Sequence, residues 1–356
     1  MSLQTRVDRP PLETVLARIE SLITGGEVLA ALDYGLAMHR QSRQFPDARL
    51  EERLVRLRHE AYAGLDRTAV REDWPPEIED FFPGQKGLVT MSPGELTTES
   101  LTSALRHHGA LIVRGLVNPV SAESMARGMD AAFDAFDQWR NGTPVSTLLP
   151  WLAPFDAGGK NSELAKLRAF ARQGGAVLTA DSPRMLSEVL EQYTAAGLIR
   201  LIGDYLGERP VVSARKSLMR RVPPDLGSAD WHQDGAFLDL GQGLRTVNVW
   251  LSLSECGAQA PAPGMELVSG RLDRIVKTGT DGACFDWTVG HEVVRELSTV
   301  HPVVKPRFEP GDALLFDEYS LHRTATGPGY SRPRYALETW FFAPSHYPAH
   351  HVPLVA

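Results

Sequence analysis

The sequence predicts an α+β protein in which helices come first and short strands later gather into a β-sandwich or jelly roll. Two observations carry this prediction. Residues 12–66 repeat apolar side chains at helical spacing. From residue 210 onwards, short runs of alternating residues are separated by Gly and Pro turns, with no long helical pattern between them. Helices followed by strands are typical of the α+β class.

Three helices are expected at the start of the chain. The first begins near residue 12 and ends at Gly25-Gly26. The second runs from Glu27 to Arg43, and the third covers residues 50–61. Such helices would pack on the rest of the chain, or on a second copy in a homodimer. A peptide-binding helical repeat is the alternative, although no second copy of the repeat is recognisable.

A proline-rich stretch at residues 74–83 marks a boundary in the chain. The length of 356 residues suggests one large domain with an appendage, or two domains. We therefore divide the chain into an N-terminal helical region, residues 1–75, and a main domain, residues 76–356.

Composition and charge exclude several classes of function. The formal net charge is -7 and no long basic run occurs, which disfavours nucleic-acid binding. No apolar run approaches the length of a membrane span, and the first residues lack the apolar core of a signal peptide. Cys256 and Cys284 are the only cysteines, so we expect a reducing compartment and no disulfide framework. These features predict a soluble cytoplasmic protein.

The middle of the chain mixes several patterns. Residues 109–115 are apolar, β-branched and flanked by Gly, which predicts a buried strand. Residues 138–180 are loop-rich and would form either a wall or lid over a site or a plain surface insertion. One helix is expected from Pro183 to about Tyr205.

Short strands follow. They are expected at residues 211–218, 246–253, 264–268, 300–308 and 313–316, and the last one at 335–342. The second of these alternates strictly, with Val and Leu residues on one face and Asn248 and Trp250 on the other. A large aromatic on that polar face would either wall a cosubstrate pocket or pack against the helices. Asn248 would contact a cosubstrate or substrate there.

Two histidines and an aspartate form a candidate metal site. His232 and Asp234 lie two apart in a run that alternates like a strand, so both side chains point to one face. His322, after a later strand, would be the third ligand. Two His and one carboxylate suit Fe(II) and leave three coordination positions for an oxo-acid cosubstrate and O2. Because His-x-Asp is common by chance, the signal depends on its companions.

The first companion is an arginine. Arg334 opens the last expected strand, and its guanidinium could grip the far carboxylate of 2-oxoglutarate. Thr324 would share that carboxylate, because it faces the same way as His322. Arg332 competes for the role but lies between Ser and Pro in a turn-like sequence, so Arg334 is favoured. A solvated strand edge is the alternative for both arginines.

Taken together, these motifs resemble the phytanoyl-CoA dioxygenase family. In chain order they are residues 231–235 (Trp-His-Gln-Asp-Gly), residues 249–253 (Val-Trp-Leu-Ser-Leu), residues 310–316 (Pro-Gly-Asp-Ala-Leu-Leu-Phe), His322-x-Thr324 and Arg334. The resemblance covers roughly residues 85–345. It implies a double-stranded β-helix (a jelly-roll, cupin-like core) flanked by helices, and an Fe(II)- and 2-oxoglutarate-dependent dioxygenase that uses O2 and releases succinate and CO2.

The resemblance also assigns roles to residues. His232, Asp234 and His322 match the catalytic iron ligands. A separate group matches the residues around the far carboxylate of 2-oxoglutarate, namely Arg334, Thr324 and Trp250. Related halogenases have Ala or Gly where Asp234 stands, so the carboxylate favours hydroxylation or another oxidation of a C–H bond.

One departure from the family pattern limits what can be inferred about the substrate. Residues 264–271 (Gly-Met-Glu-Leu-Val-Ser-Gly-Arg) replace the usual Pro-Gly-Ser-His run. The resemblance is therefore to a divergent branch of the family, and an acyl-CoA substrate does not follow by analogy.

Weaker candidates remain. Lys216 and Arg220 belong to a basic run that would meet an anionic group of the substrate, unless they are ordinary exposed charges. His346, His350 and His351 would form a second metal site or lie in a solvated tail. Two rival functions also stay open: a catalytically silent binding protein of the same fold, and a cupin-like metal enzyme that does not use 2-oxoglutarate.

Overall fold

The computed structural model describes residues 10–42, 46–68, 74–158, 161–225, 230–238, 243–348 and 350–356. The residues at the N-terminus that lack a signal-peptide pattern, and the end of the predicted second helix at Arg43, lie outside this part of the chain. Within it, no helix is both long enough and apolar enough to cross a membrane.

Nine α-helices are defined among the described residues. They are α1 (Leu12–Thr24), α2 (Val28–Gln41), α3 (Ala48–Ala61), α4 (Thr98–His108), α5 (Pro119–Arg140), α6 (Asn161–Gln173), α7 (Pro183–Ala195), α8 (Leu198–Leu206) and α9 (His291–Leu297). The strands of the same residues are β1 (Val89–Met91), β2 (Ala110–Val113), β3 (Ala176–Leu178), β4 (Val211–Ser213), β5 (Leu218–Val222), β6 (His232–Gln233), β7 (Thr246–Ser252), β8 (Cys256–Gly257), β9 (Met265–Val268), β10 (Val303–Val304), β11 (Arg307–Phe308), β12 (Ala313–Phe316), β13 (Leu321–Thr324), β14 (Arg334–Phe342) and β15 (Pro353–Val355).

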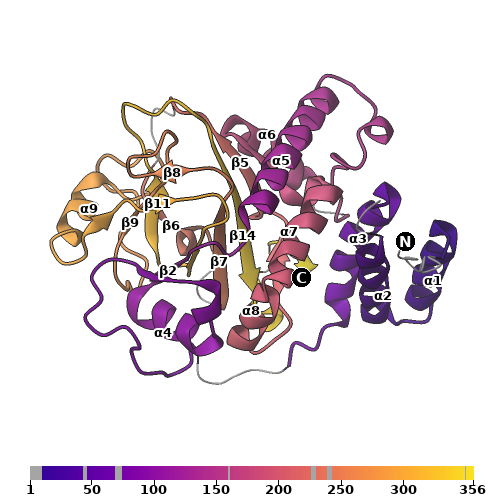
Figure 1. Cartoon of the computed structure of the whole chain (residues 1–356), viewed down its shortest axis with the longest axis horizontal. Coiled ribbons are helices and arrows are strands. Elements are labelled where there is room, and N and C mark those ends of the chain that lie inside the picture. Colours follow the sequence, from indigo (N-terminus) through magenta and orange to yellow (C-terminus); the bar gives the residue numbers. More distant parts are fainter. Residues whose placement is uncertain are drawn as a thin grey trace, which may run out of the picture.

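Most strands form two sheets that face each other, as predicted for a jelly roll, and β8 and β11 form a separate pair. The larger sheet has the order β1-β2-β12-β7-β14-β4-β15, and β5 pairs with both β14 and β3. The smaller sheet has the order β10-β9-β13-β6, and β11 pairs with β8 beside it. Figure 1 shows the smaller sheet on one side of the larger and a layer of helices on the other. The fold is therefore a jelly-roll core flanked by helices.

Strand β7 shows why the larger sheet has two different faces. Val247, Val249 and Leu251 belong to the main hydrophobic core, together with residues of α5, α7 and α8. Trp250 belongs to a separate core between the sheets, where it packs with Phe308. The predicted alternation is thus confirmed, and the alternative in which Trp250 packs against the helices is wrong.

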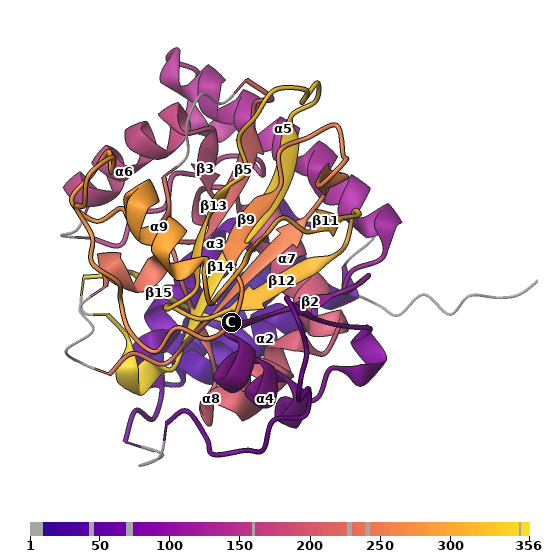
Figure 2. The same ribbon diagram turned by 90° about the vertical axis from the view of Figure 1, so that its left-hand side faces the viewer.

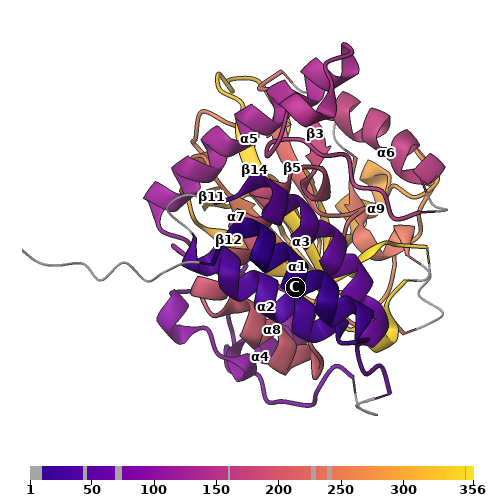
Figure 3. The ribbon, with the colours of Figure 1, turned by 90° about the vertical axis from the view of Figure 1, so that its right-hand side faces the viewer.

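The N-terminal helices pack against the main domain. Ile19, Leu54 and Leu57 share a hydrophobic core with Phe342 and Val355. Figures 1 and 3 show α1, α2 and α3 stacked next to one another, with α3 nearest to α7. This is the plainer of the two predicted arrangements, because the apolar faces of the helices are covered by the same chain. The boundary at residue 75 and a homodimer through these helices stay predictions.

Three local predictions were wrong. The helix expected from Pro183 to Tyr205 is divided into α7 and α8 by Gly197, which has a φ of 72°. A left-handed residue ends a helix, and Gly adopts that conformation without strain. The loop-rich residues 138–180 contain α6 and β3, because β3 adds to the larger sheet through β5. The strand expected at 211–218 is interrupted by a turn at 214–216 between β4 and β5.

The C-terminal tail is not solvated, contrary to one of the two alternatives predicted for it. β15 pairs with β4 and is buried, so the strand at 335–342 is not the last one. His351 is buried, and its Nδ1 lies 2.9 Å from Ser213 Oγ. The Nδ1 atom of His346 lies 2.7 Å from Ser345 Oγ. The three tail histidines do not form a second metal cluster among the described residues.

Candidate metal centre and cosubstrate pocket

The three predicted metal ligands meet between the two sheets. His232 on β6 is directly opposite His322 on β13, and their ring centroids are 4.4 Å apart. Asp234 begins the short 3₁₀ helix Asp234–Phe237 that follows β6. Its Oδ1 lies 3.8 Å from His232 Nε2 and 4.0 Å from His322 Nε2. The three ligand atoms lie within 4.8 Å of one another, so one ion could contact all three.

Backbone carbonyls orient both imidazoles. His232 Nδ1 lies 3.0 Å from the carbonyl oxygen of Asp230, and His322 Nδ1 lies 3.0 Å from that of Ser320. A carbonyl oxygen can only accept, so each Nδ1 carries the proton and each Nε2 presents its lone pair. The geometry therefore provides two imidazoles in the tautomer that binds a metal through Nε2.

Burial shifts the pKa values of two of the three metal ligands. It lowers the pKa of His232 well below its usual value, and the nearby His322 lowers it further. The pKa of Asp234 rises to about 6, chiefly through burial and against the opposing effect of His322. At neutral pH the site thus offers a neutral His232 and an ionised carboxylate, which are the forms that bind a metal.

Asn248 is placed against a metal ligand. Its Nδ2 donates a short hydrogen bond to Asp234 Oδ2. This contact leaves Oδ1 as the oxygen that faces the two histidines. Asn248 also lines the central cavity, so the predicted contact with a cosubstrate or substrate stays a prediction.

Gln233 and Gly235, which flank Asp234 in the sequence, connect the segment that carries the metal ligands to neighbouring loops. Gln233 is fully buried, and its Nε2 donates to the carbonyl oxygens of Arg274 and Tyr319 at 3.0 and 2.6 Å. The N–H of Gly235 donates to the Glu318 carbonyl at 2.9 Å, and a Cβ at Gly235 would lie 3.0 Å from that oxygen. Sequence reasoning gave neither residue a role, although both belong to the quoted motif.

Arg334 is buried completely and has only neutral partners. Its Nη1 donates to the Gly264 carbonyl at 3.0 Å, and its Nη2 lies 3.4 Å from Thr324 Oγ1. Its Nε has no hydrogen-bond partner, and no carboxylate of the described residues lies within ion-pair distance. Burial lowers the pKa of Arg334 to about 10, helped by the charge of Arg220. Arg332, the predicted competitor, is exposed.

The aromatic ring of Trp250 completes this end of the cavity. The guanidinium carbon of Arg334 lies 5.5 Å from the centre of the ring. Trp250 Nε1 is buried and, like Arg334 Nε, has no hydrogen-bond partner among the described residues. Two buried donors without acceptors are costly unless a ligand supplies the acceptors. The chemistry of this end therefore fits an anion.

One cavity of about 70 Å³ connects the metal ligands with Trp250 and Thr324. It is lined by Arg220, His232, Asp234, Asn248, Val249, Trp250, Met265, Phe316, His322, Thr324, Glu338 and Trp340. His322 and Thr324 are two residues apart on β13, a separation of about 7 Å. No residue from 138–180 is among the lining residues, so the described part of that segment supplies no wall or lid to this cavity.

The predicted basic run is divided among different partners. Arg220 lines the cavity, and its Nε lies 3.4 Å from Glu338 Oε1. Lys216 Nζ lies over two aromatic rings, 4.1 Å from the centre of Phe237 and 5.0 Å from that of Trp340. Arg221 instead pairs with Asp130 on α5. The structure thus brings Lys216 and Arg220 to the site and leaves Arg221 outside it.

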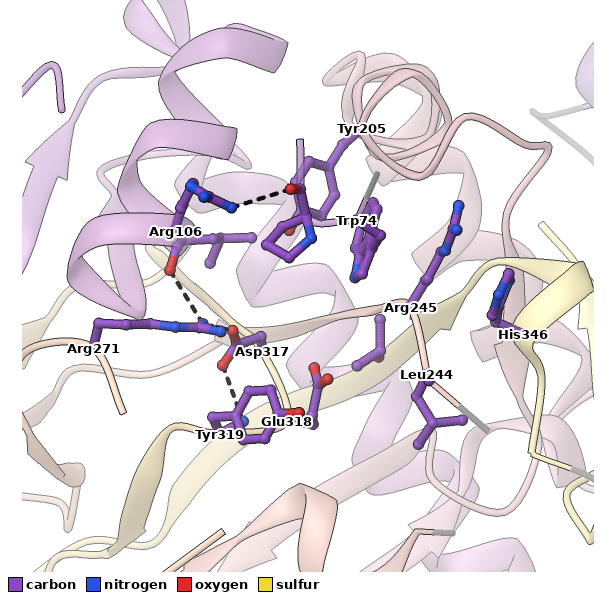
Figure 4. A pocket seen from close by; sticks show the side chains of 14 residues that line it. Trp74, Arg106, Tyr205, Leu244, Arg245, Arg271, Asp317, Glu318, Tyr319 and His346 are labelled. Carbon is purple, nitrogen blue, oxygen red and sulfur yellow. Dashed lines mark hydrogen bonds and ion pairs between the residues drawn. The ribbon is translucent and has the colours of Figure 1, made fainter. Parts of the chain in front are cut away.

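A second and larger cavity, of about 320 Å³, is shown in Figure 4. Thr246 lines it, and Thr246 Oγ1 is 3.4 Å from Asn248 Oδ1, which connects it to the metal centre. Glu318 also lines it, and burial raises the pKa of this carboxyl to about 7. Figure 4 shows the side chains of Arg106, Arg245 and Arg271 around it. Of the candidate residues named from the sequence, only His346 lines this cavity.

Comparisons with known proteins show which family and which solved structures the chain resembles. The family model described as phytanoyl-CoA dioxygenase (PhyH) matches residues 105–332. No curated protein matches the sequence. Similar solved structures include EctD from S. alaskensis with 2-oxoglutarate and 5-hydroxyectoine, at 15% identity and a TM-score of 0.48, covering 79% of this chain and 87% of that chain.

Two further solved structures resemble the chain less closely. The carbocyclase SnoK from nogalamycin biosynthesis shares 16% identity with a TM-score of 0.43, over 72% of this chain and 87% of that one. EvdO2 from Micromonospora carbonacea var. aurantiaca, complexed with 2-oxoglutarate, shares 15% identity with a TM-score of 0.43, over 71% and 90%. The family match covers well over half of the chain and includes the His-Asp-His site. The protein therefore belongs to the phytanoyl-CoA dioxygenase family.

Proposed function

We propose that this protein is an Fe(II)- and 2-oxoglutarate-dependent dioxygenase. It would hydroxylate, or otherwise oxidise, a C–H bond of a small-molecule or acyl substrate and release succinate and CO2. The observation that carries this proposal is a His-Asp-His cluster whose cavity extends to Thr324 and Trp250, the two side chains that lie against a buried arginine, Arg334, without an anionic partner.

The metal would be held by His232, Asp234 and His322. Two imidazoles and one carboxylate are the donor set that suits Fe(II) and leaves positions open. When bound, Fe(II) supplies the activation of O2 that the side chains alone cannot provide. The chain keeps the ligands in place through the carbonyl groups of Asp230 and Ser320 and the amide of Asn248.

The cosubstrate would lie between the metal ligands and Arg334. The far carboxylate of 2-oxoglutarate would accept hydrogen bonds from the guanidinium and from Thr324 Oγ1, which are already close to each other. The separation of about 7 Å between His322 and Thr324 along β13 suits a molecule with carboxylates at both ends. Trp250 would cover the bound molecule and exclude water from it, because the ring is buried beside Arg334.

Anaerobic titration with Fe(II) and 2-oxoglutarate tests this proposal. The chelate of the two has a weak visible charge-transfer band, which we expect from the wild-type protein. The band should be lost in His322→Ala and in Arg334→Ala, whereas Arg332→Ala serves as a matched control and should retain it. Formation of succinate with a substrate panel would then establish turnover.

Other outcomes favour the rival functions. Iron binding without the band, and Arg334→Ala that behaves like the wild type, would favour a cupin-like enzyme that does not use 2-oxoglutarate. A normal band without succinate formation on any substrate would favour a silent binding protein. A protein that binds no iron would contradict the metal site itself.

A further inference from the structure

The end of the cavity opposite Arg334 has its own set of side chains. Arg334 and Trp340 lie on the same face of β14, six residues or about 20 Å apart. At the Trp340 end, Lys216 and Phe237 join the edge of the site. The His232 ring lies 5.7 Å from Phe237 and 6.0 Å from Trp287, so this group borders a metal ligand directly.

Lys216 has no ion pair. Its ammonium lies over the rings of Phe237 and Trp340, and no carboxylate of the described residues lies within ion-pair distance of it. Aromatic rings attract a cation but do not neutralise it. The side chain is half-buried rather than fully solvated. A cation held in this way is available to an incoming anion.

The aromatic rings next to Lys216 form a partly exposed wall. The rings of Phe237 and Trp287 are 4.4 Å apart, and Phe285 stacks on the outer side of Trp287 at 5.1 Å. Phe285 is 51% exposed, so the wall has an edge that solvent and ligands can reach. This wall provides apolar contact area next to the metal ligand His232.

The wall is fixed relative to the metal centre. Phe285 and Trp287 belong to the long connection between β9 and β10, which runs beside the smaller sheet together with α9 (Figure 2). Asp230 Oδ2 accepts hydrogen bonds from the Cys284 N–H at 2.7 Å and from Thr288 Oγ1 at 3.0 Å. The carbonyl of the same residue orients His232. One residue thus ties the wall to a metal ligand.

We propose that Lys216, Phe237 and Trp287 bind the primary substrate, and that this substrate is an organic anion with an apolar, preferably aromatic, body. Lys216 would pair with its charged group, and the two rings would contact its body. This proposal rests on the proposed function, because it assigns Arg334 and Trp250 to the cosubstrate. It adds the class of molecule that the other end accepts.

Matched probes test the proposal. Phenylpropionate, phenylpropanol and phenylpropylamine share one body and differ in charge, and each would be titrated anaerobically into protein loaded with Fe(II) and 2-oxoglutarate. The readouts are the position of the visible band and the tryptophan fluorescence, since Trp287 and Trp340 lie at the site. We expect the anion to bind most tightly and to change both signals.

Substitutions of Lys216 and Trp287 then distinguish binding of the probe's charged group from binding of its phenylpropyl body. Lys216→Met should weaken phenylpropionate roughly ten- to a hundredfold, because a charge-assisted contact is lost, and leave phenylpropanol unchanged. Lys216→Arg should retain the preference for the anion. Trp287→Ala should weaken all three probes alike. Lys86→Met makes the same change at an exposed lysine outside the site and should have no effect.

Several results would overturn the proposal. They are equal binding of the three probes, no binding of the anion, or a Lys216→Met protein that binds phenylpropionate like the wild type. If Lys216→Met instead weakened 2-oxoglutarate, Lys216 would belong to the cosubstrate site. In each of these cases the visible band of the wild type would still form, whereas its absence would mean that the proposed function itself had failed.

Discussion

Two buried clusters of charged side chains in this protein differ in how their charges are balanced. The first joins the N-terminal helices to the main domain. There, His39 on α2 lies 2.6 Å from Glu191 and 3.2 Å from Glu51, and Glu51 also pairs with Arg184 at 2.7 Å. These partners come from α2, α3 and α7, so opposite charges within the fold neutralise one another.

The second cluster is the inner end of the metal cavity. Arg334 is as deeply buried as Glu51, yet its partners are a carbonyl, a hydroxyl and a sulfur atom. Desolvation of a charge is unfavourable unless an opposite charge compensates it. The first cluster provides the compensation from its own chain, and the second leaves it to a ligand. A buried charge without an internal partner therefore indicates a binding site, whereas a paired one indicates a structural contact.

The largest effect on the free energy of unfolding is expected from a substitution in the first cluster, whose charges balance one another. Glu51→Ala would leave His39 and Arg184 without their shared partner and should destabilise the protein by about 3–5 kcal/mol. Urea unfolding measures this change. Glu52→Ala, at the next position of α3, is the matched control and should change the stability by less than about 0.5 kcal/mol. Equal effects of the two substitutions would contradict the distinction between the clusters.

The same cluster should make stability depend on pH. Burial alone would lower the pKa of His39, but the hydrogen bonds and charges of Glu191 and Glu51 outweigh it and raise the pKa to about 9. A raised pKa stabilises the fold fully below pH 6.5, and this contribution is lost as the pH rises towards 9. The free energy of unfolding should thus fall by up to about 3 kcal/mol over this range.

Substitution of the histidine provides the control for this pH effect. His39→Gln cannot titrate, so its stability should show a much flatter profile between pH 6.5 and 9. Unfolding by urea at several pH values compares the two proteins. A wild type whose stability stays level over this range would show that the pKa of His39 is not raised in the folded state.

The unbalanced cluster should respond in the opposite direction. Arg334→Met removes a buried charge that has no internal partner, so the melting temperature of the ligand-free protein should stay the same or rise. The affinity for 2-oxoglutarate should fall roughly a hundredfold, because the charge-assisted contact is lost. Arg332→Met, two residues earlier and exposed, should change neither property. A strongly destabilised Arg334→Met protein would show that this arginine is structural.

The local parts of the metal site could be predicted from the sequence. His232 and Asp234 are two residues apart, and the period of a strand brings them to one face. The same rule placed Thr324 with His322, and Trp250 on the face opposite Val249. The cavity is lined by His232, Asp234 and His322, and also by Trp250 and Thr324, the two side chains that lie against Arg334. Local periodicity therefore sufficed wherever a side chain's direction depends on its own strand.

Contacts between distant segments could not be predicted in this way. The Asn248 amide meets Asp234 because β7 and β6 belong to opposite sheets. Trp287 reaches His232 from a long connection without regular periodicity, and no spacing in the sequence indicates that approach. Strand β15 is not predictable from the sequence, because a three-residue strand has no pattern of its own until β4 pairs with it.

The sequence by itself determined the class of the fold, the residues that can bind a metal and an arginine suited to a carboxylate. Each of these depends on chemistry and on periodicity within a few residues. Only the tertiary structure decided which charges are balanced. Whether Arg334 has a counterion, or Lys216 an aromatic neighbour, depends on segments far away in the chain. Burial and ion pairing are properties of packed elements, and for this reason they appear only once the chain has folded.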